Sequence, residues 1–135
     1  MAFIQRPGAN LYWKRDGRDD APALLLLNSI GTDMDLWDGM LPHLRDRFAV
    51  LRIDARGHGA SIAEPGDYTL VMLADDVLAA ADAAGFDRFS VAGVSLGGMI
   101  GMELALRAPE RVEKLLPICT SATMAVSYTH LRAHE

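Results

Sequence analysis

Short apolar segments alternate along this chain with segments in which apolar residues recur at helical spacing. Residues 23–27, 48–53 and 89–94 are the apolar segments, and their predicted strand cores are 24–27, 50–53 and 91–94. Runs of this kind are typical of strands covered on both faces of a parallel sheet. A fourth strand is predicted over 112–119, with its core at 114–118. Pro117 removes a backbone donor there, so this strand is expected to be an edge strand or a distorted one.

Three helices are predicted between and after these strands. The first covers residues 35–47, with Pro42 restarting it at a first-turn position. The second is capped by Thr69 and ended by Gly85. Its apolar face holds Leu70, Leu73, Val77, Leu78 and Ala81, and its predicted solvent face holds Asp75, Asp76 and Asp82. The third runs from Leu96 to just before Pro109.

The chain begins with a different pattern. Residues 3–5 and 9–14 are predicted to form two antiparallel strands joined at Pro7-Gly8, followed by a charged turn over 15–20. Together with the alternation that follows, this predicts an α/β fold. We expect a mostly parallel sheet with helices on both faces.

Composition narrows the class of protein. A length of 135 residues allows one domain, and a net charge of −5 without a Lys/Arg cluster argues against nucleic acid as a partner. The single cysteine, Cys119, fits a reducing compartment. Residues 1–8 lack the features of a signal peptide, and the apolar runs are too short to span a membrane. A cytoplasmic protein without a membrane partner is expected.

The residues with the clearest chemical meaning are Gly93-Val94-Ser95-Leu96-Gly97, a G-x-S-x-G pentapeptide between a predicted strand and a predicted helix. A sharp turn in this context lifts the serine hydroxyl clear of the sheet, and glycines on both sides avoid clashes with the crossing backbone. Ser95 is therefore the candidate nucleophile. An incidental serine in a glycine-rich turn is the alternative.

The loop 28–32, which follows the strand 23–27, could direct backbone N–H groups into a crevice at the carboxyl end of the sheet. The Ile30 N–H is the candidate donor of half of an oxyanion hole, and an ordinary strand-to-helix turn is the alternative. Ser29, Trp37 and Met99 are candidate substrate contacts, although packing is the favoured interpretation of Trp37.

The loop 54–61 is interpreted as scaffold, in which Asp54 and Ser61 accept hydrogen bonds from loose backbone N–H groups. His58 is disfavoured as a general base because no acid is placed to orient its ring. The sequence has neither metal-ligand spacing nor a dinucleotide-binding glycine loop, so no metal and no cofactor are expected.

These motifs in this order resemble the N-terminal half of an α/β-hydrolase. Residues 28–33 followed by Trp37, together with residues 54–61, resemble the 3-oxoadipate enol-lactonases. The resemblance covers roughly residues 9–124 and implies Ser95 as nucleophile, with Leu96 and Ile30 as oxyanion donors. It also implies that the catalytic Asp and His and the lid come later in the chain order. They are absent from this sequence, which is interpreted as truncated before the lid and the last strands.

Residues 125–135 depart from the family pattern and resemble translated adapter sequence, so the chain is divided into a partial hydrolase domain, 1–124, and a non-native, disordered tail. His130 and His134 are therefore not candidate bases. The resemblance implies hydrolysis of a small ester or lactone, 3-oxoadipate enol-lactone above all, in the parent protein, and an inactive fragment here. The alternatives are another carboxylesterase or perhydrolase, or a non-catalytic binding protein on this fold. Dehalogenases and epoxide hydrolases fit less well, because they place a carboxylate where Ser95 stands.

Overall fold

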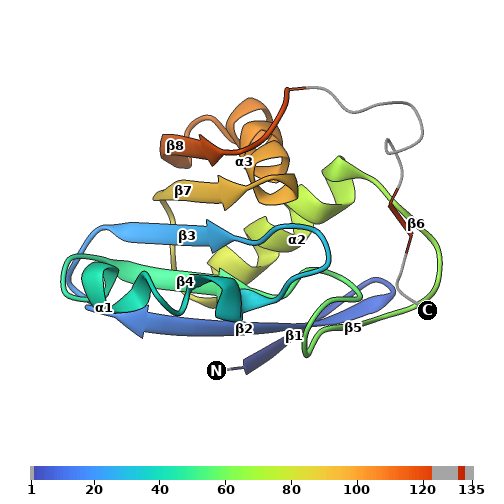
Figure 1. Ribbon diagram of the computed structural model, residues 1–135, viewed down its shortest axis with the longest axis horizontal. Coiled ribbons are helices and arrows are strands. Elements are labelled where there is room, and N and C mark those ends of the chain that lie inside the picture. The colour runs from blue at the N-terminus through green and yellow to red at the C-terminus, as the bar shows by residue number, and fades with distance from the viewer. Residues whose placement is uncertain (1, 123–130, 133–135) are drawn as a thin grey trace.

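The computed structural model describes residues 2–122 and 131–132, which fold around one mixed sheet (Figure 1). The strands are β1 (Ala2–Arg6), β2 (Ala9–Gly17), β3 (Ala23–Leu27), β4 (Ala49–Ile53), β5 (Ile62–Ala63), β7 (Phe89–Val94) and β8 (Val112–Ile118). Their order is β1-β2-β4-β3-β7-β8, with β5 paired to β2. The pairs among β4, β3, β7 and β8 are parallel, whereas β1 and β2 join antiparallel. The predicted strands and the α/β class are confirmed.

Helices cover both faces of this sheet, as predicted, but unequally (Figure 1). On one face, α2 (Leu70–Ala83) and α3 (Leu96–Arg107) bury the larger core, which includes Leu25, Leu51 and Phe89. On the other face, the helices among the described residues are the 3₁₀ helix η1 (Met34–Trp37) and the single turn α1 (Leu41–Leu44), which cover a smaller core around Leu26 and Val50.

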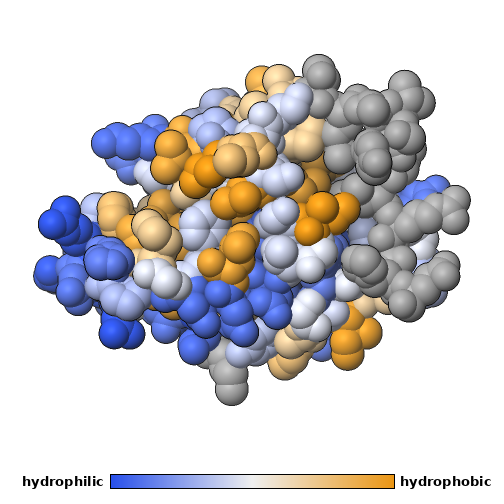
Figure 2. All heavy atoms as spheres, viewed as in Figure 1, coloured by the Kyte–Doolittle hydropathy of each residue, from blue (hydrophilic) through white to orange (hydrophobic). Residues whose placement is uncertain are grey.

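The second face therefore keeps an apolar groove over β3, β7 and β8. Its volume is about 610 Å³, and Leu26, Ala92, Leu116 and Ile118 are among the residues that line it. Figure 2 shows apolar residues gathered on this face of the molecule. The strand β8 is an edge strand among those described, as Pro117 predicts, and the Leu116 side chain on it is 59% exposed.

The prediction of one helix over residues 35–47 is wrong. The segment forms η1 and α1 with a turn between them. Pro42 stands in the first turn of α1, and because it has no N–H it cannot continue a helical ladder from the preceding turn. Leu36 and Met40, which stand at helical spacing with Leu41 and Leu44 in the sequence, are exposed.

The charged turn predicted over residues 15–20 begins later than expected. Strand β2 continues to Gly17, because Arg15, Asp16 and Gly17 pair with residues 51, 50 and 49 of β4. The Asp16 carboxylate lies 2.9 Å from a guanidinium nitrogen of the buried Arg52. Polar residues that suggest a turn in the sequence are therefore held in the sheet by pairing and by this ion pair.

Asp76 was predicted to face solvent, and that prediction is wrong. The residue is 4% exposed on α2, and its carboxylate faces Arg56 of the loop that follows β4. Asp75 and Asp82 do reach solvent and pair with arginines at the surface. Thr69 caps α2 by accepting a hydrogen bond from the Met72 N–H, and Gly85 follows the helix at φ 81°, both as predicted.

Part of the predicted tail is described. Residues Leu131–Arg132 form the short strand β9, which pairs antiparallel with β6 (Asp67–Tyr68). The other residues of the tail, 125–130 and 133–135, lie outside the described part of the chain.

Candidate active site

Ser95 occupies the junction between β7 and α3. Strand β7 ends at Val94, α3 begins at Leu96, and Ser95 stands between them at φ 54° and ψ −111°. A non-glycine residue in such a conformation carries about 1–3 kcal/mol of backbone strain, which the surrounding structure must offset. The strained strand-to-helix turn expected for a nucleophile elbow is therefore present.

The two glycines of the pentapeptide are required by close backbone contacts. A Cβ atom at Gly93 would overlap the carbonyl oxygen of Gly97, and one at Gly97 would overlap that of Leu27 and lie 2.9 Å from that of Asn28. The first turn of α3 therefore packs directly against the end of β3. Any larger side chain at either position would push the elbow away from the sheet.

The loop after β3 lies at the same end of the sheet as Ser95. Strands β3 and β7 run parallel, with Leu27 paired to Gly93, so both chains leave the sheet side by side. Asn28 anchors the loop from inside. Its buried amide donates to the Ile53 carbonyl oxygen at 2.8 Å and accepts from the Trp37 indole N–H at 2.9 Å.

Neither candidate oxyanion donor is engaged by another of the described residues. Among the hydrogen bonds between described residues, none uses the backbone N–H of Ile30 or Leu96. The Ile30 N–H belongs to the Ser29–Ile30 peptide and the Leu96 N–H to the Ser95–Leu96 peptide. Such N–H groups at the end of a parallel sheet are available to an incoming anion or oxyanion.

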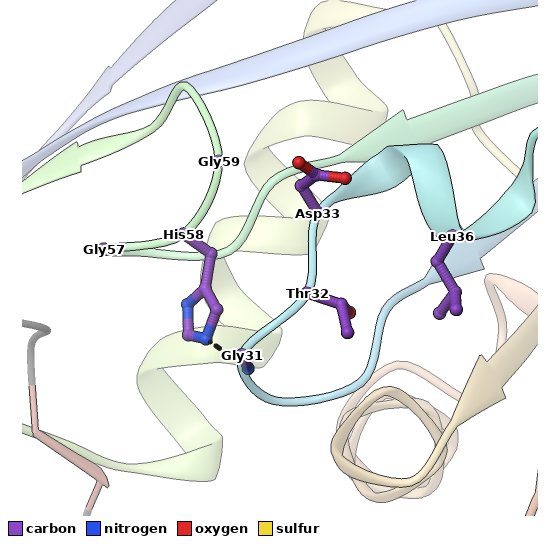
Figure 3. A pocket seen from close by; sticks show the side chains of 7 residues that line it. All are labelled: Gly31, Thr32, Asp33, Leu36, Gly57, His58 and Gly59. Carbon is purple, nitrogen blue, oxygen red and sulfur yellow. Dashed lines mark hydrogen bonds between the residues drawn. The ribbon is translucent and has the colours of Figure 1, made fainter.

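His58 contacts this loop, not Ser95. Its Nε2 accepts a hydrogen bond from the Gly31 N–H at 2.9 Å, and its Nδ1 lies 2.9 Å from the Arg56 carbonyl oxygen (Figure 3). Since Nε2 accepts, the ring proton is on Nδ1 and points at Arg56. The lone pair that a general base would use is occupied, in agreement with the scaffold interpretation of His58.

The loop 54–61 is held as predicted. The Asp54 carboxylate accepts from the Met34 N–H at 2.8 Å and from the Ala60 N–H at 2.9 Å. The Ser61 hydroxyl donates to the Asp54 carbonyl oxygen at 2.6 Å and accepts from the Tyr12 N–H at 2.8 Å. This loop borders a cavity of about 500 Å³ between residues 31–33 and 57–59, beside the loop that carries Ile30 (Figure 3).

A buried ion cluster behind this loop was missed by sequence reasoning. Asp76 receives hydrogen bonds from Arg56 at 2.6 and 3.0 Å and from Arg6 at 3.1 Å, and Arg56 also donates to the Pro7 carbonyl oxygen. The hydrogen bonds from Arg56 to Asp76 raise the pKa of this guanidinium above its usual value. No local signal reveals the cluster, because its members come from β1, a loop and α2.

The three candidate substrate contacts differ in their exposure. Trp37 is 6% exposed and donates to Asn28, which agrees with the favoured interpretation of it as a packing residue. Met99 is likewise buried in α3, whereas Ser29 is half-buried in the loop beside Ile30. Contact with substrate stays a prediction for all three residues.

Metal-binding clusters and membrane-spanning helices are absent from the described residues. No group of His, Cys, Asp and Glu side chains among them is arranged to hold a metal ion. Nor does any described helix have the length and apolar character needed to cross a bilayer.

Known proteins are similar to this chain in sequence and in fold. Residues 22–132 match the alpha/beta hydrolase fold family. A relative named 3-oxoadipate enol-lactonase 2, from Acinetobacter baylyi, is 36% identical over 78% of the chain and 40% of its own length. A putative carbamate hydrolase RutD from Agrobacterium fabrum is 33% identical over 80% of the chain and 42% of its own length.

Solved structures agree. A hydrolase from Pseudomonas aeruginosa PA01 superposes with a TM-score of 0.90 at 47% identity, over 94% of this chain and 48% of that one. The enol-lactonase from Burkholderia xenovorans LB400 gives 0.87 at 37% identity, over 91% and 48%. The chain thus spans less than half the length of these relatives. The chain belongs to the α/β-hydrolase family.

Proposed function

We propose that the protein to which this chain belongs is a serine hydrolase of carboxylic esters or lactones, with Ser95 as its nucleophile. The observation that carries the proposal is the backbone of Ser95 itself. It is held in a strained conformation between β7 and α3, beside an unengaged Leu96 N–H. Strain of this kind is retained where it serves a site.

The proposed reaction proceeds in two steps, acylation of Ser95 and hydrolysis of the acyl-enzyme. The Ser95 Oγ attacks the carbonyl carbon of the substrate and gives up its proton to a general base, which passes it to the departing oxygen. Water then hydrolyses the acyl-enzyme by the same route and restores the Ser95 hydroxyl. In both steps the carbonyl oxygen becomes an oxyanion, which the N–H groups of Leu96 and Ile30 stabilise.

The base for these steps is proposed to lie beyond the described residues. Within residues 2–122, the Ser95 hydroxyl makes no hydrogen bond to a histidine or a carboxylate. His43 is exposed on α1, and the Nε2 of His58 is bound to the Gly31 N–H. We infer that the acid and base of the triad come from later strands, as the resemblance implies.

For the substrate, 3-oxoadipate enol-lactone is the first candidate, which would place the protein in aromatic catabolism in the cytoplasm. Its support is the relatives that carry that name, at 36% and 34% identity. Carbamates are the second candidate, because relatives named putative carbamate hydrolase reach 36% identity. Both substrates present a carbonyl carbon to the same nucleophile, so the elbow does not distinguish them.

A labelling experiment tests this function. The whole protein and its Ser95→Ala variant are treated with a fluorophosphonate probe, and hydrolysis of enol-lactone, p-nitrophenyl acetate and a simple carbamate is measured. We expect labelling and turnover of one substrate class in the native protein and neither in the variant. Equal labelling of both proteins would refute Ser95 as nucleophile, and an unlabelled, inactive native protein would favour a non-catalytic binding role.

A further inference from the structure

Each of the two proposed donor peptides accepts a hydrogen bond from a threonine hydroxyl at its carbonyl oxygen. The Thr32 hydroxyl donates to the Ser29 carbonyl oxygen at 2.6 Å, and the Thr120 hydroxyl donates to the Ser95 carbonyl oxygen at 2.6 Å. Ser29 O belongs to the same peptide as the Ile30 N–H. Ser95 O belongs to the same peptide as the Leu96 N–H.

This placement has a direct geometric consequence. A trans peptide is planar, and its C=O and N–H point in opposite directions, so a bond that fixes the oxygen also fixes the N–H. No cis peptide occurs among the described residues. Each threonine hydroxyl therefore orients one donor N–H by binding the carbonyl oxygen of the donor's peptide. A hydrogen bond to the carbonyl also polarises the peptide and strengthens the N–H as a donor.

Backbone groups bind the same carbonyls less closely. Ser29 O accepts from the Thr32 N–H at 3.3 Å, and Ser95 O accepts from the N–H groups of Gly98 and Met99 at 3.0 and 3.2 Å. In both peptides, the threonine hydroxyl is the shortest of these contacts. Oxygen-to-oxygen hydrogen bonds near 2.7 Å are well formed, so these two contribute to the rigidity of the site.

Thr120 is held in place by α3. It follows β8 by two residues and is half-buried, and a Cβ atom at Gly98 would lie 2.7 Å from its Cγ2. With the methyl group against Gly98, the hydroxyl is directed at Ser95 O. Thr69, by contrast, caps a helix by accepting from Met72, and it touches neither donor peptide.

We propose that Thr32 and Thr120 are positioning residues that orient the two oxyanion donors through the carbonyls of their peptides. The proposal rests on the proposed function, since it assumes that the Ile30 and Leu96 N–H groups bind the oxyanion. It adds that Thr120, which follows β8, orients the Leu96 N–H of the elbow. It also adds that Thr32, within the loop after β3, orients the Ile30 N–H of the same loop.

The test uses the whole protein with Thr32→Val and Thr120→Val, which keep the side-chain shape and remove the hydroxyl. Thr32→Ser and Thr120→Ser instead keep the hydroxyl and remove only the methyl group. Thr69→Val is the matched control, because it weakens a helix cap without touching either donor peptide. For each variant, kcat and KM for an ester, affinity for a trifluoromethyl ketone and thermal stability are measured, with Ser95→Ala as the reference for the function itself.

Loss of one oxyanion donor costs about 10²–10³ in kcat, so we expect a misdirected donor to cost at least about tenfold. The valine variants should lose kcat and bind the ketone, a transition-state analogue, more weakly by a similar factor. KM should change little. The serine variants should recover most of both losses. Thr69→Val should lose thermal stability alone.

Failure of this proposal is distinct from failure of the function. Activity that survives Ser95→Ala refutes the proposed function. If Ser95→Ala abolishes activity while both valine variants keep native kcat and ketone affinity, only the positioning role is overturned. If a valine variant does not fold, Thr→Ala takes its place at that position. Failure of both to fold would show that the hydroxyl serves the fold, and this too overturns the proposal.

Discussion

The carboxylate of Asp76 faces the guanidinium of Arg56 with two hydrogen bonds, at 2.6 and 3.0 Å, and both side chains are 5% exposed. Arg6 adds a third contact to the same carboxylate at 3.1 Å. The pair joins α2 to the loop that carries His58, and thereby to Gly31. One buried ion pair thus supports the rear of the candidate site.

We expect Asp76→Asn to destabilise the protein by about 3–5 kcal/mol, because it leaves a buried guanidinium without its counter-charge. Asp75→Asn is the matched control on the same helix. Asp75 pairs with Arg107 at the surface, where both side chains are 39% exposed, so its loss should cost no more than about 1 kcal/mol. Denaturant unfolding of the two variants measures the difference, and equal losses would contradict it.

Ser95→Gly should raise stability where Ser95→Ala does not. Glycine adopts positive φ without strain, so the change at φ 54° should return about 1–3 kcal/mol, less the entropy that glycine loses on folding. Alanine keeps the strain and removes only the hydroxyl. Thermal unfolding of both variants tests this. A glycine variant no more stable than the alanine variant would show that the elbow stores no strain.

The 135-residue chain by itself is expected to show no measurable turnover of an enol-lactone or of p-nitrophenyl acetate. Enzymes that lose a triad member keep a residual acceleration of about 10³–10⁴ over water, but that acceleration presumes an intact pocket. The assay compares the purified chain with its Ser95→Ala variant. Robust turnover that Ser95→Ala abolishes would show a competent base within the chain. His58 would be the first candidate for that base, once its Nε2 no longer accepts the hydrogen bond from the Gly31 N–H.

Leu116→Lys should improve the solubility of this chain. Leu116 is 59% exposed on the edge strand β8, beside the apolar groove, and a lysine there discourages pairing with another chain. Leu115→Lys is the control. Its side chain points to the opposite face of the strand and packs against the larger core, so the same substitution should destabilise the fold. Soluble yield and light scattering distinguish the two; equal yields would contradict the edge argument.

Much of the fold follows from local patterns. The mostly apolar runs predict β3, β4 and β7 because a strand covered on both faces has few positions that reach solvent. The elbow is also local. Gly93 and Gly97 flank Ser95 within five residues, and the close contacts that require them lie within the motif and at the adjacent strand end.

Other features were misjudged because their causes lie far away in the chain. Asp76 occupies a position on α2 that local periodicity assigns to solvent. It is buried because Arg6 and Arg56 approach it from β1 and from the loop after β4. Periodicity records which residues share a helix face. It cannot record which charged groups another segment brings to that face.

The orientation of the Leu96 N–H likewise depends on a residue far away in the chain. Ser95 and Leu96 can be identified as nucleophile and donor from the pentapeptide alone, yet the group that orients their shared peptide is Thr120, 25 residues later and on the far side of β8. A hydrogen bond of 2.6 Å requires the whole of α3 and β8 to be packed before its two oxygens meet. The sequence by itself determined the strands, the turn and the reactive serine, because each depends on neighbouring residues. Tertiary structure alone decided what holds them in position, because those contacts form only when distant segments pack together.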